Sequence, residues 1–405
     1  ETNAPGTEYQ FDETTLPHQL VREADGSFKF GVVDWNDRLV GDDITNRKPS
    51  FVGQQLRNLF FYRNRFGFLV GETIVLSQAG DFFNFWNNSA QRSQLDDPID
   101  ITVSSTRPQF LNFVEASSVG LVIFGQTEQF MLSTDSDILS PTTAKVNRIA
   151  SIECDGKVNT VSLGTSLGFV SKTTLYSRIF ELMDISNAEP PTILDQTEPV
   201  PELIPSTIDS MIASAGLSII SVGTTGSSSI YQFRYSQRKD RRQASTWYRW
   251  ELTGTLLDQF FDISTYYATV GNGSKVYLES LDLTQAAEAG FLTLPTGEKT
   301  DACIDLWDAN PYRTYDSSTG NTRIFLPFDH IADKTFTVLA LGNYIGSTGV
   351  ITGASAGSVE YPTVSGSTGN YYADIPGDFR GRDILIGYIY NMEVQIPKFY
   401  YKQTN

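Results

Sequence analysis

The sequence has few of the residues that carry most enzyme chemistry, with two cysteines and two histidines in 405 residues. Cys154 and Cys303 cannot form a disulfide framework and lack the spacing of a metal site, so we expect small buried side chains. Neither His18 nor His330 has a serine or cysteine nearby in a nucleophile motif, which argues against a hydrolytic triad. We therefore expect no catalytic, cofactor-binding or metal-binding residues, and no enzyme activity.

Long apolar runs and positive charge are also scarce. No run approaches the roughly 20 residues that a membrane helix needs, and the first residues do not form a signal peptide. Lys and Arg total 30 against 47 Asp and Glu, a formal net charge of −17. This balance argues against a protein that grips DNA or RNA, because such affinity comes mainly from basic side chains on phosphates. Acidic walls would suit a channel through which DNA slides, and acidity that only keeps the surface soluble is the alternative.

What the chain does have is a repeat of apolar hairpins. In five windows an apolar run ends on a small residue and a second apolar run follows after a short polar turn. The small residues, 54, 46, 52 and 48 positions apart, are Gly71, Gly125, Ser171, Gly223 and Gly271. An earlier apolar position recurs eleven or twelve residues before four of them, at Leu59, Phe113, Met211 and Phe260. In the unit of Ser171, Val158 and Val161 bracket that position.

A period near 50 residues made of three or four short strands is typical of a β-propeller. One small sheet cannot bury both of its faces alone, so such sheets stack radially on their neighbours. The alternative is a β-sandwich whose hairpins recur by chance at strand spacing. With 12% aromatic residues and many Ser, Thr and Gly residues, we expect an all-β fold. It would hold a propeller-like repeat of about five or six blades and an additional β-rich domain.

The composition predicts three regions. Residues 1–54 are a polar lead-in with one strand near Phe28–Val33, 55–283 hold the repeats, and 284–405 form an additional β-rich region. The apolar strands expected at Ile384–Tyr390 and Met392–Ile396 stop nine residues before the last one, and the chain has no initiating Met. We therefore expect a fragment whose last region is truncated at its C-terminal end.

Pairs of acidic residues are frequent, and two carboxylates are what a glycosidase needs. They include Asp42-Asp43 and Asp96-Asp97, the second with Asp100 close by. In an acidic chain such residues usually bond to backbone amides in turns. The run from Asp97 to Asp100 lacks the spacing of a calcium loop. We expect structural roles for these side chains.

One basic cluster interrupts the acidic chain. It consists of Arg234, Arg238, Lys239, Arg241 and Arg242, and the aromatic run Trp247-Tyr248-Arg249-Trp250 follows it. Basic and aromatic residues together can bind nucleic acid or glycan. The cluster could also be a solvated hairpin tip, or a cationic loop that docks on the acidic face of a neighbouring subunit. We favour the subunit contact, and these five residues are the candidate contact residues.

Several strings between residues 38 and 100 carry a family resemblance. They are Arg38–Asp42 (RLVGD), Pro49–Gly53 (PSFVG), Arg63–Leu69 (RNRFGFL), Leu76–Phe85 (LSQAGDFFNF) and Asp97–Asp100 (DPID). In this order they resemble the tail tubular protein B, or nozzle, family of T7-like podoviruses. Phe66 stands where the family pattern leads us to expect Leu, and family members are considerably longer. The chain resembles their central portion.

The resemblance implies a structural virion protein of the short phage tail. Six copies would form a ring below the portal and the tail adaptor protein, extend the tail tube and help to seat the tail fibres. Phage DNA would pass through during genome ejection without specific binding. The family fold is described as propeller-like with added β domains, and assembly would take place in the host cytoplasm. The family motif contains no catalytic residues, and no cofactor is implied. The alternative function is a carbohydrate-binding or carbohydrate-cleaving β-propeller.

Overall fold

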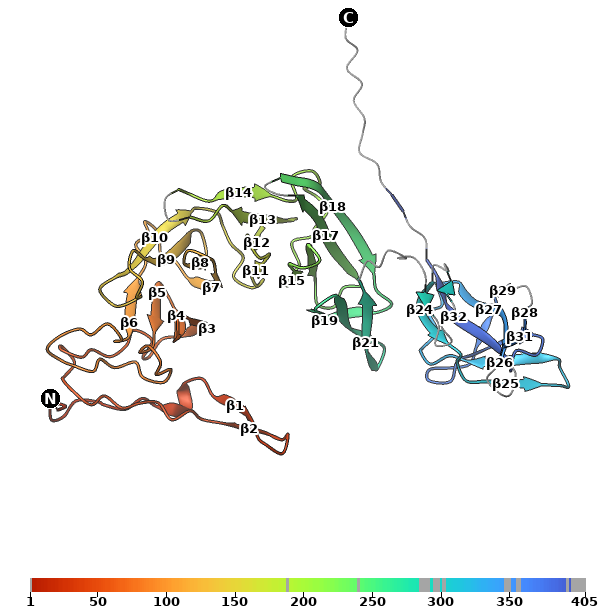
Figure 1. Ribbon diagram of the computed structural model, residues 1–405, viewed down its shortest axis with the longest axis horizontal. Coiled ribbons are helices and arrows are strands. Elements are labelled where there is room, and N and C mark those ends of the chain that lie inside the picture. Colours follow the sequence, from red (N-terminus) through yellow and green to blue (C-terminus); the bar gives the residue numbers. More distant parts are fainter. Residues whose placement is uncertain are drawn as a thin grey trace, which may run out of the picture. The chain divides into compact units, whose positions relative to one another are not determined.

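Strands dominate both parts of the chain, as the computed structural model in Figure 1 shows. The described residues are 2–186, 189–238, 241–283, 292–293, 299–300, 304–345, 351–354, 358–390 and 393–394. Within them the single helical element is a 3₁₀ turn at Glu13–Thr15, which confirms the prediction of an all-β fold. The chain divides into two compact units, Glu1–Leu283 and Thr284–Asn405.

Five antiparallel sheets make up most of the first unit, and in each sheet consecutive strands are neighbours. The first sheet contains β3 (Leu56–Tyr62), β4 (Arg65–Val70), β5 (Thr73–Leu76) and β6 (Ile99–Thr102). The second contains β7 (Leu111–Ala116), β8 (Leu121–Gly125), β9 (Gln129–Thr134) and β10 (Ala144–Ala150). The third contains β11 (Val161–Ser162), β12 (Leu167–Lys172), β13 (Ser177–Met183) and β14 (Thr192–Asp195). The fourth contains β15 (Ser210–Ser214), β16 (Ile219–Gly223), β17 (Ser229–Arg238) and β18 (Arg241–Glu251). The fifth has three strands, β19 (Thr255–Asp262), β20 (Thr265–Asn272) and β21 (Lys275–Asp282).

The predicted repeat coincides with these sheets. The five windows are the hairpins β4–β5, β8–β9, β12–β13, β16–β17 and β20–β21. The earlier apolar positions fall on β3, β7, β15 and β19, and of the two residues that bracket this position in the third unit, Val161 lies on β11 and Val158 before it. In the third window Leu175 and Tyr176 lie in the turn, and the strand begins at Ser177. Tyr176 is held there because it forms an isolated β-bridge with Pro205 and its carbonyl accepts a hydrogen bond from the Thr173 amide, 2.8 Å long.

Consecutive sheets share their cores. Leu69 and Ile74 of the first sheet pack with Leu121 and Ile123 of the second, and three further cores join the second to the third, the third to the fourth and the fourth to the fifth sheet. Every residue of β4, β8 and β16 is buried, because these central strands have a neighbouring layer on both faces. Among the described residues no core joins the fifth sheet to the first, and a closed propeller stays a prediction.

The lead-in before residue 55 covers the outer face of the first sheet. Val33, Trp35 and Phe51 pack there against Phe66 and Phe68 in an aromatic core. The expected strand in this segment is β2 (Phe28–Gly31), which pairs with β1 (Gln19–Arg22) as a two-stranded ribbon.

The second unit has two larger sheets around a core of its own, with Ile324, Val338, Ile375 and Ile386 at its centre. One sheet contains β24 (Ile304–Ala309), β32 (Arg382–Ile389), β27 (Phe336–Ile345), β28 (Ile351–Ala354) and β29 (Ser358–Glu360). The other contains β25 (Arg313–Asp316), β26 (Asn321–Phe325), β31 (Tyr372–Pro376) and β30 (Val364–Ser365). A short pair, β22 (Leu292–Thr293) and β23 (Lys299–Thr300), precedes them. The expected strand Ile384–Tyr390 is β32, and most of Met392–Ile396 lies outside the described residues.

Candidate assembly surfaces

The predicted basic cluster lies on the long hairpin of β17 and β18. Arg238 pairs with Arg241 and Gln237 with Arg242, next to a register shift, so three of the arginines meet at the tip of the hairpin. Lys239, the fourth residue there, lies outside the described residues. The side chains of Arg238, Arg241 and Arg242 also lie outside the described residues, so the register places only their backbone at the tip.

Arg234 is separate from this tip. It lies further down β17, between Ile219 of β16 and Thr246 of β18, and is half-buried within the fourth sheet. Burial raises the pKa of the nearby Tyr248 phenol, and the positive charge of Arg234 partly opposes that increase. The backbone register thus places Arg238, Arg241 and Arg242 at the tip and Arg234 midway along β17.

The aromatic residues after the cluster are used in packing. Trp247 lies against Phe233, with ring centroids 4.9 Å apart, and its Nε1 donates to the carbonyl of Gln196 over 2.8 Å. Trp250 meets Tyr266 of the fifth sheet edge to face at 5.5 Å. These rings join the fourth sheet to its neighbours, so they are not arranged as an exposed platform for bases or sugars.

Two buried arginines hold the family strings in place. Arg65, on β4, is 1% exposed and donates through its guanidinium to main-chain carbonyls of two loops. The acceptors are Ser77 (2.7 Å), Asp97 (2.7 Å), Asp96 (3.2 Å), Leu95 (3.2 Å) and Leu139 (3.2 Å). Burial lowers the pKa of Arg65, with the charges of Asp96 and Asp97 acting in the opposite direction. This role was not predicted from the sequence, where the signal is a single charge at the start of the otherwise apolar strand β4.

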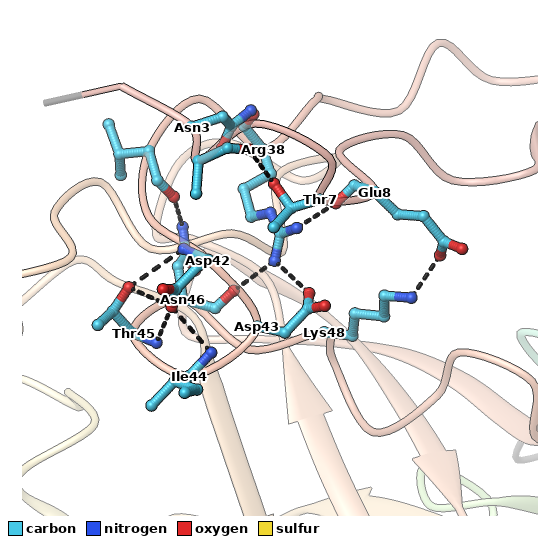
Figure 2. A network of polar contacts seen from close by, with 12 residues as sticks. Asn3, Thr7, Glu8, Arg38, Asp42, Asp43, Ile44, Thr45, Asn46 and Lys48 are labelled. Atoms are coloured by element: carbon cyan, nitrogen blue, oxygen red, sulfur yellow. Dashed lines mark hydrogen bonds and ion pairs between the residues drawn. The ribbon is translucent and has the colours of Figure 1, made fainter.

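Arg38 is the second buried arginine, and Figure 2 shows its contacts. Its Nη1 donates to Asp43 over 2.9 Å and to the carbonyl of Asn46 over 3.0 Å, while its Nη2 donates to the carbonyl of Glu8. The guanidinium also lies 5.0 Å from the ring centroid of Trp86. These contacts tie the first ten residues of the lead-in to the loop after β5.

Three of the acidic residues that could have formed a catalytic pair, Asp42, Asp97 and Asp100, accept hydrogen bonds from backbone amides. Asp97 is fully buried, with Oδ1 3.1 Å from the Asn88 amide and Oδ2 2.7 Å from the Gln94 amide. Asp100 accepts hydrogen bonds from both the amide and the hydroxyl of Ser50, at 2.7 and 2.8 Å. Each carboxylate therefore fixes a loop.

Asp42 has the same role in the turn after Arg38. Its carboxylate accepts from the amides of Thr45 and Ile44, at 2.9 and 3.0 Å. These hydrogen bonds, the one from Thr45 first, lower the pKa of Asp42 below the ordinary value.

The two histidines and the described cysteine have structural surroundings. His330 Nδ1 lies 3.0 Å from the hydroxyl of Tyr388, and burial lowers its pKa. The His18 ring stacks on Phe30 with centroids 5.4 Å apart. Burial raises the pKa of the Cys154 thiol to about 12, and the side chain of Cys303 lies outside the described residues.

Within the part of the chain that the structure describes, no group of three or more His, Cys, Asp or Glu side chains is placed to hold a metal ion. None of the helices there has the length and apolar character needed to span a bilayer.

Solved structures share only a weak likeness with the chain. Hsv2p of Kluyveromyces lactis superposes with a TM-score of 0.39 at 10% identity, covering 80% of this chain and 93% of that one. A luciferin-regenerating enzyme gives a TM-score of 0.31 at 12% identity, covering 65% and 83%. Likenesses at this level do not bear on function.

Sequence comparisons are more specific. The tail tubular protein gp12 of Escherichia phage T7 is 31% identical over 421 residues, which covers 100% of this chain and 50% of the T7 protein. The chain therefore spans half the length of that relative. A family model described as bacteriophage nozzle protein matches residues 1–405, and it confirms the resemblance carried by the strings around Arg38 and Arg65. Because this match covers the whole sequence, the chain belongs to the bacteriophage nozzle protein family and is a structural component of a phage tail.

Proposed function

We propose that the chain forms part of a non-enzymatic subunit of a ring-shaped conduit in a short phage tail. The observation that carries this proposal is the match of the nozzle family model to residues 1–405. Six copies of the whole protein would surround a channel, with the tail adaptor protein on one side and tail fibres seated on the outside. The chain would assemble with these partners in the host cytoplasm.

The architecture of the first unit supports a rigid wall element. Its five sheets share continuous cores, and buried arginines and carboxylates fix the loops of the first sheet. A run of sheets joined in this way would suit a tail tube, which has to keep its shape while the genome passes. A wall element of this kind needs no catalytic pocket.

The charge of the chain supports passage of DNA without binding. A net charge of −17 repels a polyanion, and basic side chains are the groups that would hold DNA by its phosphates. Acidic surfaces on the channel side would therefore keep the genome moving. The same negative charge supplies docking surfaces for the three arginines at the β17–β18 tip.

A head-to-tail ring places different flanks of two copies against each other. In this ring the tip at Arg238, Arg241 and Arg242 contacts an acidic flank of the next copy. Replacing all three by Glu in the full-length protein should prevent ring formation, because like charges across a contact cost several kcal/mol. Native mass spectrometry should then give monomers where the unchanged protein gives hexamers.

The matched control is Arg92→Glu, since Arg92 is exposed and outside the tip. It should leave the hexamer intact. Hexamers of the triple variant equal in amount to those of the control would rule out the tip as a contact. Electron microscopy of the full-length protein tests the broader proposal, which fails if no ring is seen.

A further inference from the structure

The fifth sheet differs from the first four in having one open face. Along its central strand β20, Tyr266, Ala268 and Val270 are buried against the fourth sheet, whereas the alternate residues are half-buried. The central strands β4, β8 and β16 are buried at every position. Since successive side chains of a strand point to opposite faces, one side of the fifth sheet lacks a packing partner among the described residues.

The open face combines apolar side chains with acids. The register places Phe260 opposite Tyr267, with ring centroids 4.9 Å apart, and Leu278 opposite Thr269 on the same face. Leu278 is 62% exposed and Phe260 42%. Asp258 and Asp262 lie on this face as well, opposite Thr269 and Thr265 in the register.

The ribbon of β1 and β2 has the complementary composition. Leu20 pairs with Phe30 and Arg22 with Phe28, so these four side chains share one face. Phe30 is 70% exposed, and Leu20 and Phe28 are each 64% exposed. A two-stranded ribbon is marginally stable by itself in water, and three or more strands or a packing partner are needed. The ribbon therefore lacks the layer that would bury its aromatic face.

The charges on the two surfaces also match. Arg22 has no ion pair within the described residues, and Asp258 and Asp262 have none there either. Packing the ribbon on the open face would bring the Arg22 cation to the Asp258 and Asp262 carboxylates within an apolar contact. Opposite charges placed in this way steer association and fix its register.

Other residues of the lead-in already pack on the face of a sheet. Directly after the ribbon, Val33 and Trp35 cover the outer face of the first sheet, so the lead-in already closes one end of the run of five sheets. The open face belongs to the sheet at the other end of that run. A contact that joins two different ends is heterologous and can repeat around a ring.

We propose that the β1–β2 ribbon of one copy packs on the open face of the fifth sheet of a neighbouring copy. The occupant is a second copy, because within one chain the ribbon and the open face are both exposed. This contact deepens the proposed function and rests on it for the presence of several copies. It is independent of the arginine tip, since none of its residues lies on β17 or β18.

A cysteine crosslink between two single variants tests the contact. Phe30→Cys and Leu278→Cys are made separately in the full-length protein, with Cys303 and any reactive cysteine outside residues 1–405 replaced by Ser. The buried Cys154 remains. Mixing the two variants under mild oxidation should give a disulfide-linked dimer. Mixing Phe30→Cys with Leu175→Cys should not, because Leu175 is exposed, at 67%, but lies in the turn before β13.

A charge exchange adds specificity to the test. Arg22→Glu in the Phe30→Cys variant should lower the yield of crosslinked dimer about tenfold, and Asp262→Arg in the Leu278→Cys variant should restore it. Rings seen by electron microscopy without this crosslink overturn the inference and leave the proposed function standing. A Phe30→Cys, Leu278→Cys double variant that crosslinks only within one chain also overturns it. If neither ring nor crosslink forms, both proposals fail.

Discussion

Two buried charges, Arg38 and Arg65, explain part of the composition of the family strings. A guanidinium has five N–H donors and stays ionised, so in an apolar interior it is stabilised by several acceptors around it. Arg65 has five carbonyl acceptors, and Arg38 has a carboxylate, two carbonyls and the face of Trp86. The strings could be located from the sequence by their order. Their roles could not, because the loops that supply the acceptors lie up to 74 residues away along the chain.

Replacing Arg65 by Met should destabilise the first unit by about 3 to 5 kcal/mol, because buried carbonyls lose their donors and water cannot replace them. Urea unfolding followed by tryptophan fluorescence measures the change, since Trp35 and Trp86 lie near the first sheet. The control is Arg92→Met, at an exposed site, which should change stability by less than about 0.5 kcal/mol. Equal effects of the two substitutions would contradict the role of Arg65.

At the scale of elements, the hairpins were predictable and their environments were not. The positions that mark the repeat require a small residue for different reasons. Gly71 has φ +55°, a conformation that favours glycine, whereas a Cβ at Gly223 would lie 2.4 Å from Leu256 of the next sheet. The spacing of apolar residues in the sequence predicts strands and turns, but contacts between sheets depend on which faces meet. For the same reason the open face of the fifth sheet was not foreseen: the run Val276–Leu278 reads like the other windows.

The joint between the second and third sheets should respond to pH through Glu115. Its carboxylate on β7 accepts a hydrogen bond from the hydroxyl of Thr160, just before β11, at 2.9 Å. Burial raises the pKa of Glu115 above the ordinary 4.5, and the Thr160 hydrogen bond opposes this in part. The neutral form of Glu115 is thus favoured in the folded state. The stability that Glu115 contributes in this form is lost as the pH rises through its raised pKa.

Glu115→Gln, which keeps an acceptor for Thr160, should therefore be more stable than the unchanged chain at pH 7, with a smaller difference at pH 4. Urea midpoints at the two pH values give the comparison. Glu198→Gln, at an exposed position, is the control and should keep the pH dependence of the unchanged chain. If Glu115→Gln shows that same dependence, burial of the Glu115 carboxyl does not affect folding.

On the scale of the whole molecule, two units with separate cores make up the chain. The cores of the first unit contain residues up to Leu283, and the core around Ile375 contains residues of the second unit alone. Stability in each unit comes from apolar area buried within it. The boundary after Leu283 is visible in the sequence because the apolar hairpins spaced by about 50 residues end there. The pairing of β32 with both β24 and β27 was not, because it joins strands that are far apart along the chain.

Because the two units have separate cores, a cavity made in one unit should destabilise that unit and leave the other unchanged. Ile375, on β31, is fully buried, and Ile375→Ala should destabilise the second unit by about 2 to 5 kcal/mol through lost burial and an unfilled cavity. In hydrogen exchange followed by mass spectrometry, the amides of β25, β26 and β31 should lose protection while those of β8 and β16 keep theirs. The exposed Val359→Ala, also in the second unit, controls for loss of a side chain that packs little. Equal loss of protection in β8 and β31 would mean that the two units unfold as one, and a tail wall made of them would then be a single cooperative body.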